Sequence, residues 1–132
     1  MIYETSFVVY PQDTNALKMD MVFGGKMMSE MDKAAAIVVK RLMVENKLDK
    51  NLYAVTVGVN KLTFTKGAYL GNLVRITATY EDHGKTSITV KVKAYVEDLN
   101  TGKNGQMASG LFTFCVVRAG NGENIPVEHG LD

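Results

Sequence analysis

Hydrophobic residues recur at two different periods along this chain, and the change between the two periods divides the sequence. From about 24 to 46 apolar residues return every three to four positions, which predicts an amphipathic helix. After a polar turn at 46–51 the period changes to two, as expected for strands. Ile88, Val90 and Val92, for example, alternate with polar residues, which is typical of an antiparallel strand with one buried face. The strands are expected at about 3–9, 55–64, 73–82, 86–98 and 107–118.

One long helix after a first strand, followed by four more strands, predicts an α+β fold in which an antiparallel sheet curls around the helix. A chain of 132 residues can bury a core of its own. No repeat or Pro/Gly/Ser-rich linker divides it. We therefore expect one domain over residues 1–132, with a loose surface tail at about 119–132.

Charge and composition exclude several classes of partner. Lys and Arg total 15 and Asp and Glu total 14, so the net charge of +1 does not favour nucleic acid or an acidic membrane surface. The only cysteine, Cys115, has no second cysteine with which to form an internal disulfide. The longest apolar run, at 34–39, is far too short to cross a bilayer. We expect a soluble, cytoplasmic protein with no nucleic-acid or membrane partner.

The predicted helix carries one carboxylate in an unexpected place. At about 100° per residue, its apolar residues fill an arc of roughly 200°, wider than a surface helix needs. Asp32 is the only charged residue inside this arc. Proteins keep a carboxylate in apolar surroundings only if it is hydrogen-bonded, paired or used. Asp32 therefore either bonds a loop amide or a lysine at the edge of the arc, or serves as a general base or nucleophile.

The start of the same helix offers a second chemical feature, the pair Gly24-Gly25. Glycines leave the first backbone N–H groups accessible at the positive end of the helix dipole, where an anion or a developing oxyanion is stabilised. The alternative is that a glycine only permits tight entry of the chain beneath the sheet.

The spacing between Gly25 and Asp32 limits how they can cooperate. Seven residues at 1.5 Å each place them roughly 10 Å apart along the helix. A base and an oxyanion donor that serve one reacting carbon must each lie within about 3 Å of their targets. If both act, two copies of the chain must meet. Two antiparallel helices related by a twofold axis would create two such sites.

Several short motifs in a fixed order complete the sequence picture. Together they resemble the hotdog-fold acyl-CoA thioesterases of the bacterial short/medium-chain and brain-type acyl-CoA hydrolase family, over about 7–117. The resemblance implies a five-stranded antiparallel sheet wrapped around one long central helix, dimers joined edge to edge, and often a trimer of dimers. The motifs are Asp13-Thr14-Asn15, Phe23-Gly24-Gly25, Met31-Asp32, Gly71-Asn72-Leu73-Val74 and Gly84-Lys85-Thr86-Ser87-Ile88.

The resemblance also implies an activity, the hydrolysis of acyl-CoA to a free acid and CoA, with no metal and no cofactor beyond the CoA part of the substrate. In that family the residue matching Asp32 is the catalytic carboxylate. The residue matching Asn15 holds the thioester or the attacking water, and the amide matching Gly25 polarises the thioester carbonyl. Asn15 and Gly25 would come from one protomer and Asp32 from its partner.

The phosphates of CoA need cations, hydroxyls or free amides near the mouth of such a site. The alternative for a lysine at a strand end is to guard the edge of the sheet. Met27, Met28 and Met31 either line an acyl tunnel or fill the core. The substrate-binding candidates are Gly24, Lys61, Lys66, Lys85, Thr86 and Ser87.

One departure from the family pattern keeps other functions open. Eight residues, 16–23, separate Asn15 from the glycine pair where the family usually has six, and Lys18 replaces a glycine. The remodelled loop leaves a second hypothesis, a hotdog dimer that binds CoA or another nucleotide-like ligand without catalysis. A purely structural role is a third.

Overall fold

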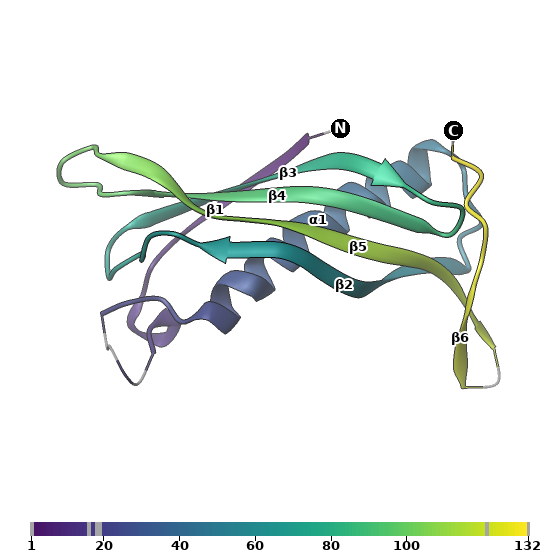
Figure 1. Ribbon diagram of the computed structural model, residues 1–132, viewed down its shortest axis with the longest axis horizontal. Coiled ribbons are helices and arrows are strands. Elements are labelled where there is room, and N and C mark those ends of the chain that lie inside the picture. Colours follow the sequence, from purple (N-terminus) through teal and green to yellow (C-terminus); the bar gives the residue numbers. More distant parts are fainter. Residues whose placement is uncertain (1, 16, 18–19, 121, 132) are drawn as a thin grey trace.

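One long helix lies against an antiparallel sheet in the part of the chain that the structure describes (Figure 1). The structure is a computed structural model, and it describes residues 2–15, 17, 20–120 and 122–131. The helix is α1 (Gly24–Glu45), and a single 3₁₀ turn, η1 (Pro11–Asp13), precedes it. The strands are β1 (Ile2–Val8), β2 (Leu52–Phe64), β3 (Leu73–His83), β4 (Ser87–Glu97), β5 (Asn104–Gly120) and β6 (Glu123–Pro126).

The strands pair in the order β1-β3-β4-β5-β2, all antiparallel, and β6 adds to the end of β5. The predicted alternation is confirmed in β4, where Ile88, Val90, Val92 and Ala94 are fully buried. Phe112 and Phe114 of β5 join the same core. The core therefore lies between α1 and the central strands, and β2 is left at one edge of the sheet.

The buried face of α1 is narrower than the predicted apolar arc. Met28, inside that arc, is 41% exposed. The helix ends at a capping side chain, because Asn46 Nδ2 donates to Leu42 O at 2.8 Å. None of the helices within the described ranges is long and apolar enough to cross a membrane. The buried residues of α1 are Met27, Met31, Ala34, Ala35, Val38, Val39 and Met43.

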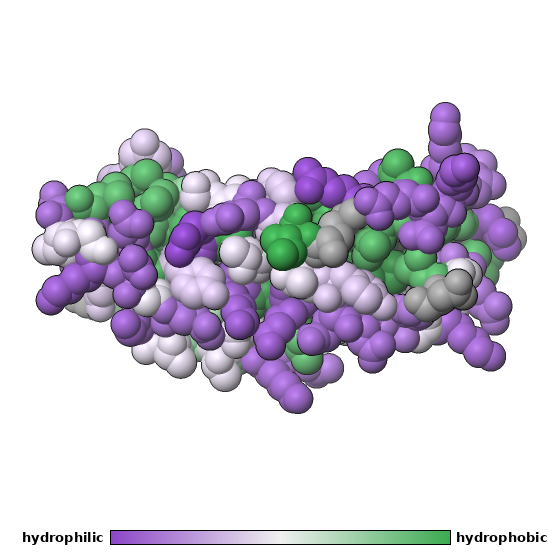
Figure 2. Space-filling view, turned by 90° about the horizontal axis from the view of Figure 1, so that it is seen from above, coloured by the Kyte–Doolittle hydropathy of each residue, from purple (hydrophilic) through white to green (hydrophobic). Residues whose placement is uncertain are grey.

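The edge strand β2 is irregular and partly apolar. Its register against β5 shifts between Thr56 and Gly58 and again between Asn60 and Thr63. Lys61, within the second irregularity, has a positive φ of 53°. Val57 is 60% exposed. Apolar surface also appears elsewhere, as separate patches among hydrophilic side chains on the face in Figure 2. Bulges of this kind bend and twist an edge strand, and an exposed edge is open to pairing with another chain.

The tail is more ordered than the sequence suggested, and the main sheet gains a sixth strand. β5 continues to Gly120, and β6 pairs with it from Glu123 to Pro126. His129 is buried: its Nε2 lies 2.9 Å from Ser87 O, and Leu131 N donates to its Nδ1 at 3.1 Å. The polar composition of this segment hid these long-range backbone pairings, so the expectation of a loose tail does not hold for its described residues.

Candidate functional site

Asp32 lies on the side of α1 that faces the edge strand. Its side chain is half-buried, and its Oδ1 accepts a hydrogen bond from the Thr56 hydroxyl at 2.8 Å. Thr56 is an exposed residue of β2, at the first irregularity of that strand. The partner is thus neither the loop amide nor the lysine considered from sequence. Among the described residues, Asp32 Oδ2 has no hydrogen-bond partner, so half of the carboxylate is available to a ligand.

The first turn of α1 leaves two backbone donors available. Lys26 N and Met27 N both donate to Phe23 O, whereas the N–H groups of Gly24 and Gly25 have no partner among the described residues. Phe23, the N-cap residue, contributes no side-chain cap. Both glycines are exposed, so their N–H groups retain the anion-binding character of a helix start.

The two glycines have different surroundings. A Cβ built on Gly24 would meet no atom within 4 Å. At Gly25 the same atom would lie 3.2 Å from the ring of Phe23. A side chain at position 25 would therefore crowd the aromatic ring beside it. This close approach gives Gly25 a steric requirement that Gly24 lacks.

Gly25 and Asp32 stand on nearly the same side of α1, because seven residues make almost two full turns. They are separated by roughly 10 Å along the axis, as the sequence predicted. One chain therefore presents the N–H of Gly25 and the carboxylate of Asp32 about two turns apart, too far to contact the same reacting carbon.

The loop that carries Asn15 closes on itself. Asn15 N donates to Met21 O at 2.9 Å, and Thr14 and Val22 form a β-bridge. Leu17 is fully exposed, which fits an outward bulge of the longer loop. Lys18, which replaces the family's glycine, lies outside the described residues. The ends of the loop thus stay together although the segment is longer than the family pattern.

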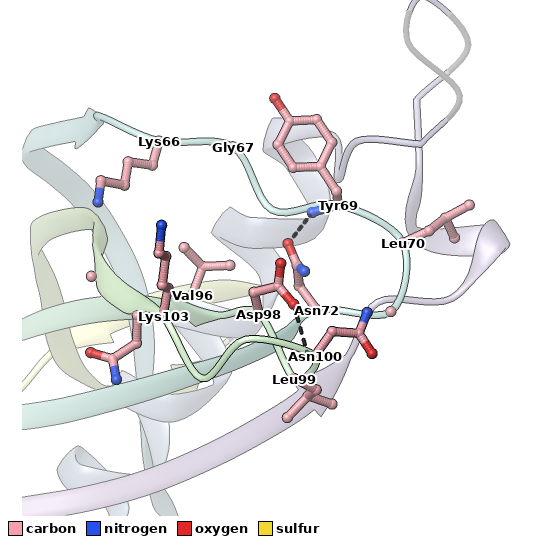
Figure 3. A pocket seen from close by; sticks show the side chains of 13 residues that line it. Lys66, Gly67, Tyr69, Leu70, Asn72, Val96, Asp98, Leu99, Asn100 and Lys103 are labelled. Carbon is pink, nitrogen blue, oxygen red and sulfur yellow. Dashed lines mark hydrogen bonds between the residues drawn. The ribbon is translucent and has the colours of Figure 1, made fainter.

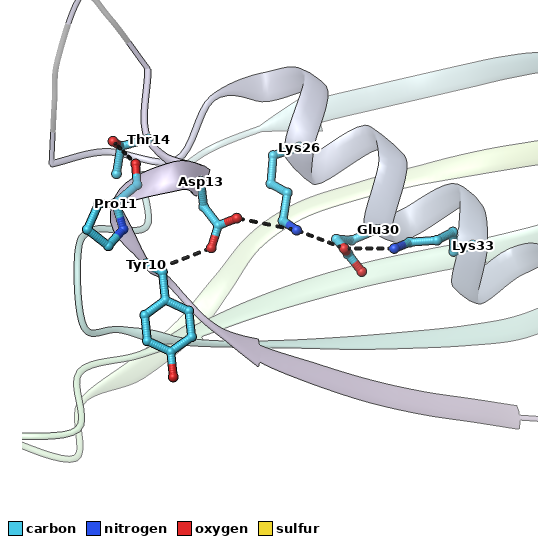
Figure 4. Close-up of polar contacts among 7 residues, drawn as sticks. All are labelled: Tyr10, Pro11, Asp13, Thr14, Lys26, Glu30 and Lys33. Atoms are coloured by element: carbon cyan, nitrogen blue, oxygen red, sulfur yellow. Dashed lines mark hydrogen bonds and ion pairs between the residues drawn. The ribbon is translucent and has the colours of Figure 1, made fainter.

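A chain of charged side chains ties this loop to the first turns of α1 (Figure 4). Asp13 is only 6% exposed; its Oδ2 accepts from Tyr10 N at 3.0 Å, and its Oδ1 lies 3.3 Å from Lys26 Nζ. Lys26 Nζ also lies 3.0 Å from Glu30 Oε1, which Lys33 Nζ reaches at 3.0 Å. The network fixes the position of η1, and thereby the start of the Asn15 loop, relative to Gly25.

The same network shifts two pKa values. The hydrogen bond to Glu30 raises the pKa of Lys26 above its usual range, although burial opposes the shift. For Glu30, burial alone would raise the pKa, but hydrogen bonds and charge attraction from Lys26 and Lys33 outweigh it and lower the pKa. Lys26 and Glu30 are therefore held as a charged pair beside the helix start.

One of the predicted phosphate-binding lysines lies in a polar hollow close to α1. Lys66 follows β2, and with Lys103 it lines a cavity of about 660 Å³ (Figure 3). Lys66 lies across Gly105, where an added Cβ would come within 2.6 Å of its Nζ. Glycine at 105 thus makes room for the ammonium group of Lys66. The hollow combines two cations and amide groups such as that of Asn72 with one carboxylate, Asp98, whose Oδ1 accepts from Asn100 N. The cations outnumber the carboxylate, which is suitable for a phosphorylated ligand.

Gly24 lines a hollow that also contains Lys66, but the other predicted binding residues are not brought to this end of the sheet. Lys61 lines a different hollow with Glu81 and Lys91, on the sheet face away from α1. Lys85, Thr86 and Ser87 lie at the turn between β3 and β4, at the opposite end of the sheet (Figure 1). Ser87 pairs with Cys115, whereas Lys66 lies beside Gly105, ten positions away along β5, a span of up to roughly 33 Å.

Sequence reasoning missed Thr56, Lys103 and the buried pairing of Asp13 with Lys26. The motif Asp13-Thr14-Asn15 drew attention to Asn15, but a carboxylate three residues after Tyr10 is also a signal for a cap on a tight turn. Thr56 carries no local signal, because its role depends on how β2 lies against α1.

Comparison with known proteins identifies the family. The Thioesterase superfamily matches residues 19–103, more than half of the chain. The acyl-CoA thioester hydrolase YciA of Escherichia coli is 30% identical over 122 residues, covering 89% of this chain and 86% of the relative. An uncharacterized acyl-CoA thioester hydrolase of Buchnera aphidicola is 35% identical over 91 residues, 69% of this chain; this match spans only 61% of the relative's own length.

A solved structure, the hexameric thioesterase of Yersinia pestis, has a TM-score of 0.74 at 28% identity, with 93% of this chain and 92% of that chain covered. The match confirms the hotdog architecture expected from the sequence, with the short strand β6 in addition to the five expected strands. With its sheet wrapped around one helix and a family match over more than half of its residues, the chain belongs to the thioesterase superfamily.

Proposed function

We propose that this protein is an acyl-CoA thioesterase that hydrolyses acyl-CoA to a free acid and CoA at a site shared by two copies of the chain. Its relatives named as acyl-CoA thioester hydrolases support the reaction. The observation that carries the proposal is Asp32, a carboxylate held by one hydroxyl of the edge strand and open on its other oxygen. Its position on α1, two turns beyond the free N–H of Gly25, supports the shared site.

The edge strand β2 is the part of the fold best suited to meet a second copy. It is 13 residues long, no strand of the described residues pairs with its outer side, and it exposes Val57 and Phe64. Pairing of two β2 edges would join two sheets and place two α1 helices side by side and antiparallel. Gly25 of each chain would then face Asp32 of the other. A trimer of such dimers is the next level, which the hexameric neighbour supports.

The proposed chemistry needs one base and one oxyanion donor. Asp32 takes a proton from water, and the resulting hydroxide attacks the thioester carbon while the carbonyl oxygen accepts a hydrogen bond from Gly25 N–H. Collapse of the intermediate breaks the C–S bond, and the departing thiolate of CoA takes the proton from Asp32. In the alternative route Asp32 attacks the carbon itself, the C–S bond breaks and CoA leaves as the thiolate. Water then hydrolyses the anhydride, which regenerates the Asp32 carboxylate, releases the acid and supplies the proton that the thiolate takes up. In both routes the Asp32 carboxylate is required, and Asn15 holds the thioester or the water.

The CoA part of the substrate fits the polar hollow of Lys66 and Lys103. Two ammonium groups can neutralise phosphate charge there, close to where α1 begins. In an antiparallel pair of helices, the β3–β4 turn of one chain approaches the Gly25 end of the other. Lys85, Thr86 and Ser87 would thereby become further contacts for CoA, although they lie far from Gly25 within one chain.

Replacing Asp32 by Asn tests the proposal. We expect kcat/KM for acyl-CoA, followed by release of free thiol, to fall by about 10²- to 10⁴-fold, because the amide cannot accept the proton. The thermal midpoint and the oligomeric state should not change. Glu45→Gln, an exposed carboxylate at the end of the same helix, is the matched control and should retain activity. Wild-type rates in the Asp32→Asn protein would refute the assignment.

The longer Asn15 loop favours one second candidate, a module that binds CoA or another nucleotide-like ligand without hydrolysis. Such a protein would gain thermal stability from CoA. Neither the wild type nor Asp32→Asn would release thiol from any acyl-CoA. The thiol assay combined with a thermal shift therefore separates the two functions.

A further inference from the structure

A second hollow, of about 380 Å³, lies against the first two turns of α1. Its volume is within the range of small-molecule sites. Gly24 and Met27 line it from the helix, Phe64 from the end of β2, and Met107 from β5. Met27 and Met107 are 2% exposed, so they form its floor, whereas Phe64 is 45% exposed and lies at its rim.

The lining of this hollow suits a flexible hydrocarbon chain. Three methionines, Met21, Met27 and Met107, contribute to it, and methionine side chains adapt to occupants of variable shape. The hollow shares Lys66 and Gly67 with the polar hollow described above. An acyl-CoA whose phosphates lie near Lys66 and whose carbonyl reaches the first N–H groups of α1 would direct its acyl chain into this space.

The remaining wall is built by the end of the longer loop. Val22 N donates to Ala68 O at 2.8 Å, and Met21 forms a β-bridge with Tyr69. The loop is therefore fastened to the segment that follows β2. Met21 lies very close to this segment, because a Cβ on Gly67 would lie 3.0 Å from Met21 Sδ. Met21 has little room to withdraw from the hollow on that side.

From these contacts we infer that Met21 is a specificity-determining residue, whose side chain limits the length of the acyl chain that the hollow accepts. The inference rests on the proposed function and deepens it. It also gives the longer loop a role, since the loop delivers Met21 and Val22 to the wall while Leu17 points to solvent. For Met28 and Met31 the sequence left open whether they line a tunnel or fill the core; Met28 is exposed, and Met31 belongs to the buried core.

Two substitutions on opposite sides of the Met21–Gly67 contact test the inference. Met21→Ala enlarges the hollow. Gly67→Ala adds a methyl group that would lie 3.0 Å from Met21 Sδ and 3.2 Å from Tyr69 Cζ, so the Met21 side chain is pressed away from Gly67. We expect the ratio of kcat/KM for long over short saturated acyl-CoAs, from butyryl to palmitoyl, to rise at least about tenfold in Met21→Ala and to fall in Gly67→Ala. Val44→Ala, an exposed apolar residue near the end of α1, should leave the ratio unchanged.

The same series is measured by thermal shift with non-hydrolysable thioether analogues of the acyl-CoAs, so that binding is read without turnover. If the chain-length dependence of binding changes with the residue at position 21, but the wild type hydrolyses no acyl-CoA, the acyl site is supported and the thioesterase function is refuted. Folded Met21→Ala and Gly67→Ala proteins that keep the wild-type chain-length ratio would overturn the inference. If Met21→Ala does not fold, Met21→Val, which removes less volume, and Gly67→Ala carry the same decision.

Discussion

Two aspartates beside the first turns of α1 have opposite surroundings. Asp13 is 6% exposed and uses both oxygens, one for Tyr10 N–H and the other for Lys26. Asp32 is half-buried at the sheet edge, and within the described part of the chain its one side-chain partner is the neutral hydroxyl of Thr56. A carboxylate with both oxygens engaged and a cation beside it stabilises the structure, whereas one with a free oxygen at an open edge can accept a proton from a substrate. The comparison indicates that burial and a charged partner mark Asp13 as a structural aspartate, whereas Asp32, the proposed catalytic carboxylate, has no charged partner among the described residues.

The largest effect expected on stability is at Asp13. Asp13→Ala leaves Tyr10 N–H without its acceptor and removes one partner of Lys26, so the free energy of unfolding should fall by about 1–3 kcal/mol. Asp13→Asn keeps an acceptor for Tyr10 and should lose less. Urea unfolding measures both, with Glu45→Ala, at an exposed carboxylate of α1, as the control. A change below about 0.5 kcal/mol in Asp13→Ala would remove the distinction between the two aspartates.

A smaller effect, on catalysis rather than stability, is expected at Thr56. Thr56→Val removes the hydrogen bond that orients Asp32. The free energy of even a weak hydrogen bond to a charged group is equivalent to about a tenfold change in rate, so we expect kcat to fall by about that factor. KM and the thermal midpoint should change little, and Thr56→Ser, which keeps the hydroxyl, should behave like the wild type. Equal rates in the valine and serine variants would show that Thr56 does not position Asp32.

The smallest effect is the pH dependence that Glu30 adds. Its pKa is lower in the folded protein than the usual 4.5, since Lys26 and Lys33 outweigh the effect of burial. Its contribution to stability is therefore complete above about pH 4.5 and is lost as the pH falls through the lower, folded pKa.

Urea unfolding between about pH 6 and pH 3 should accordingly show a shallower loss of stability in Glu30→Gln than in the wild type. The difference should stay below about 1 kcal/mol, because the ion pair is partly exposed. Glu45→Gln is the control and should follow the wild-type curve; identical curves for Glu30→Gln would contradict the assigned shift.

Much of the fold was readable from the sequence because its periods are strong. The helix expected at about 24–46 is α1, Gly24–Glu45, and the alternation in 86–98 identifies the buried face of β4. The rise per residue of an α-helix was enough to predict that Gly25 and Asp32 lie too far apart to act on one carbon within a single chain. These features depend on residues close together in the chain, where periodicity carries the information.

Features that depend on distant residues could not be predicted in this way. The contact of Thr56 with Asp32 requires β2 to be the edge strand and to shift register at that residue. The strand β6 and the buried His129 need partners on β5 and on the β3–β4 turn, and nothing in their local sequence names those partners. Tertiary pairing, rather than local pattern, determines each of these positions.

The account's central claim is that Gly25 of one protomer and Asp32 of its partner form one site. It is tested most directly by mixing two inactive chains, Asp32→Asn and Gly25→Pro. Proline removes the N–H, and its fixed φ suits the first helical turn. Its ring displaces the partly exposed Phe23 side chain, so the thermal midpoints of both parents are measured first. Heterodimers isolated through two different tags contain one site with both defects and one intact site, so they should recover about half of the wild-type rate per dimer. Recovery to that level is the predicted result. Heterodimers that stay as inactive as either parent would contradict it, because each site would then lie within a single chain.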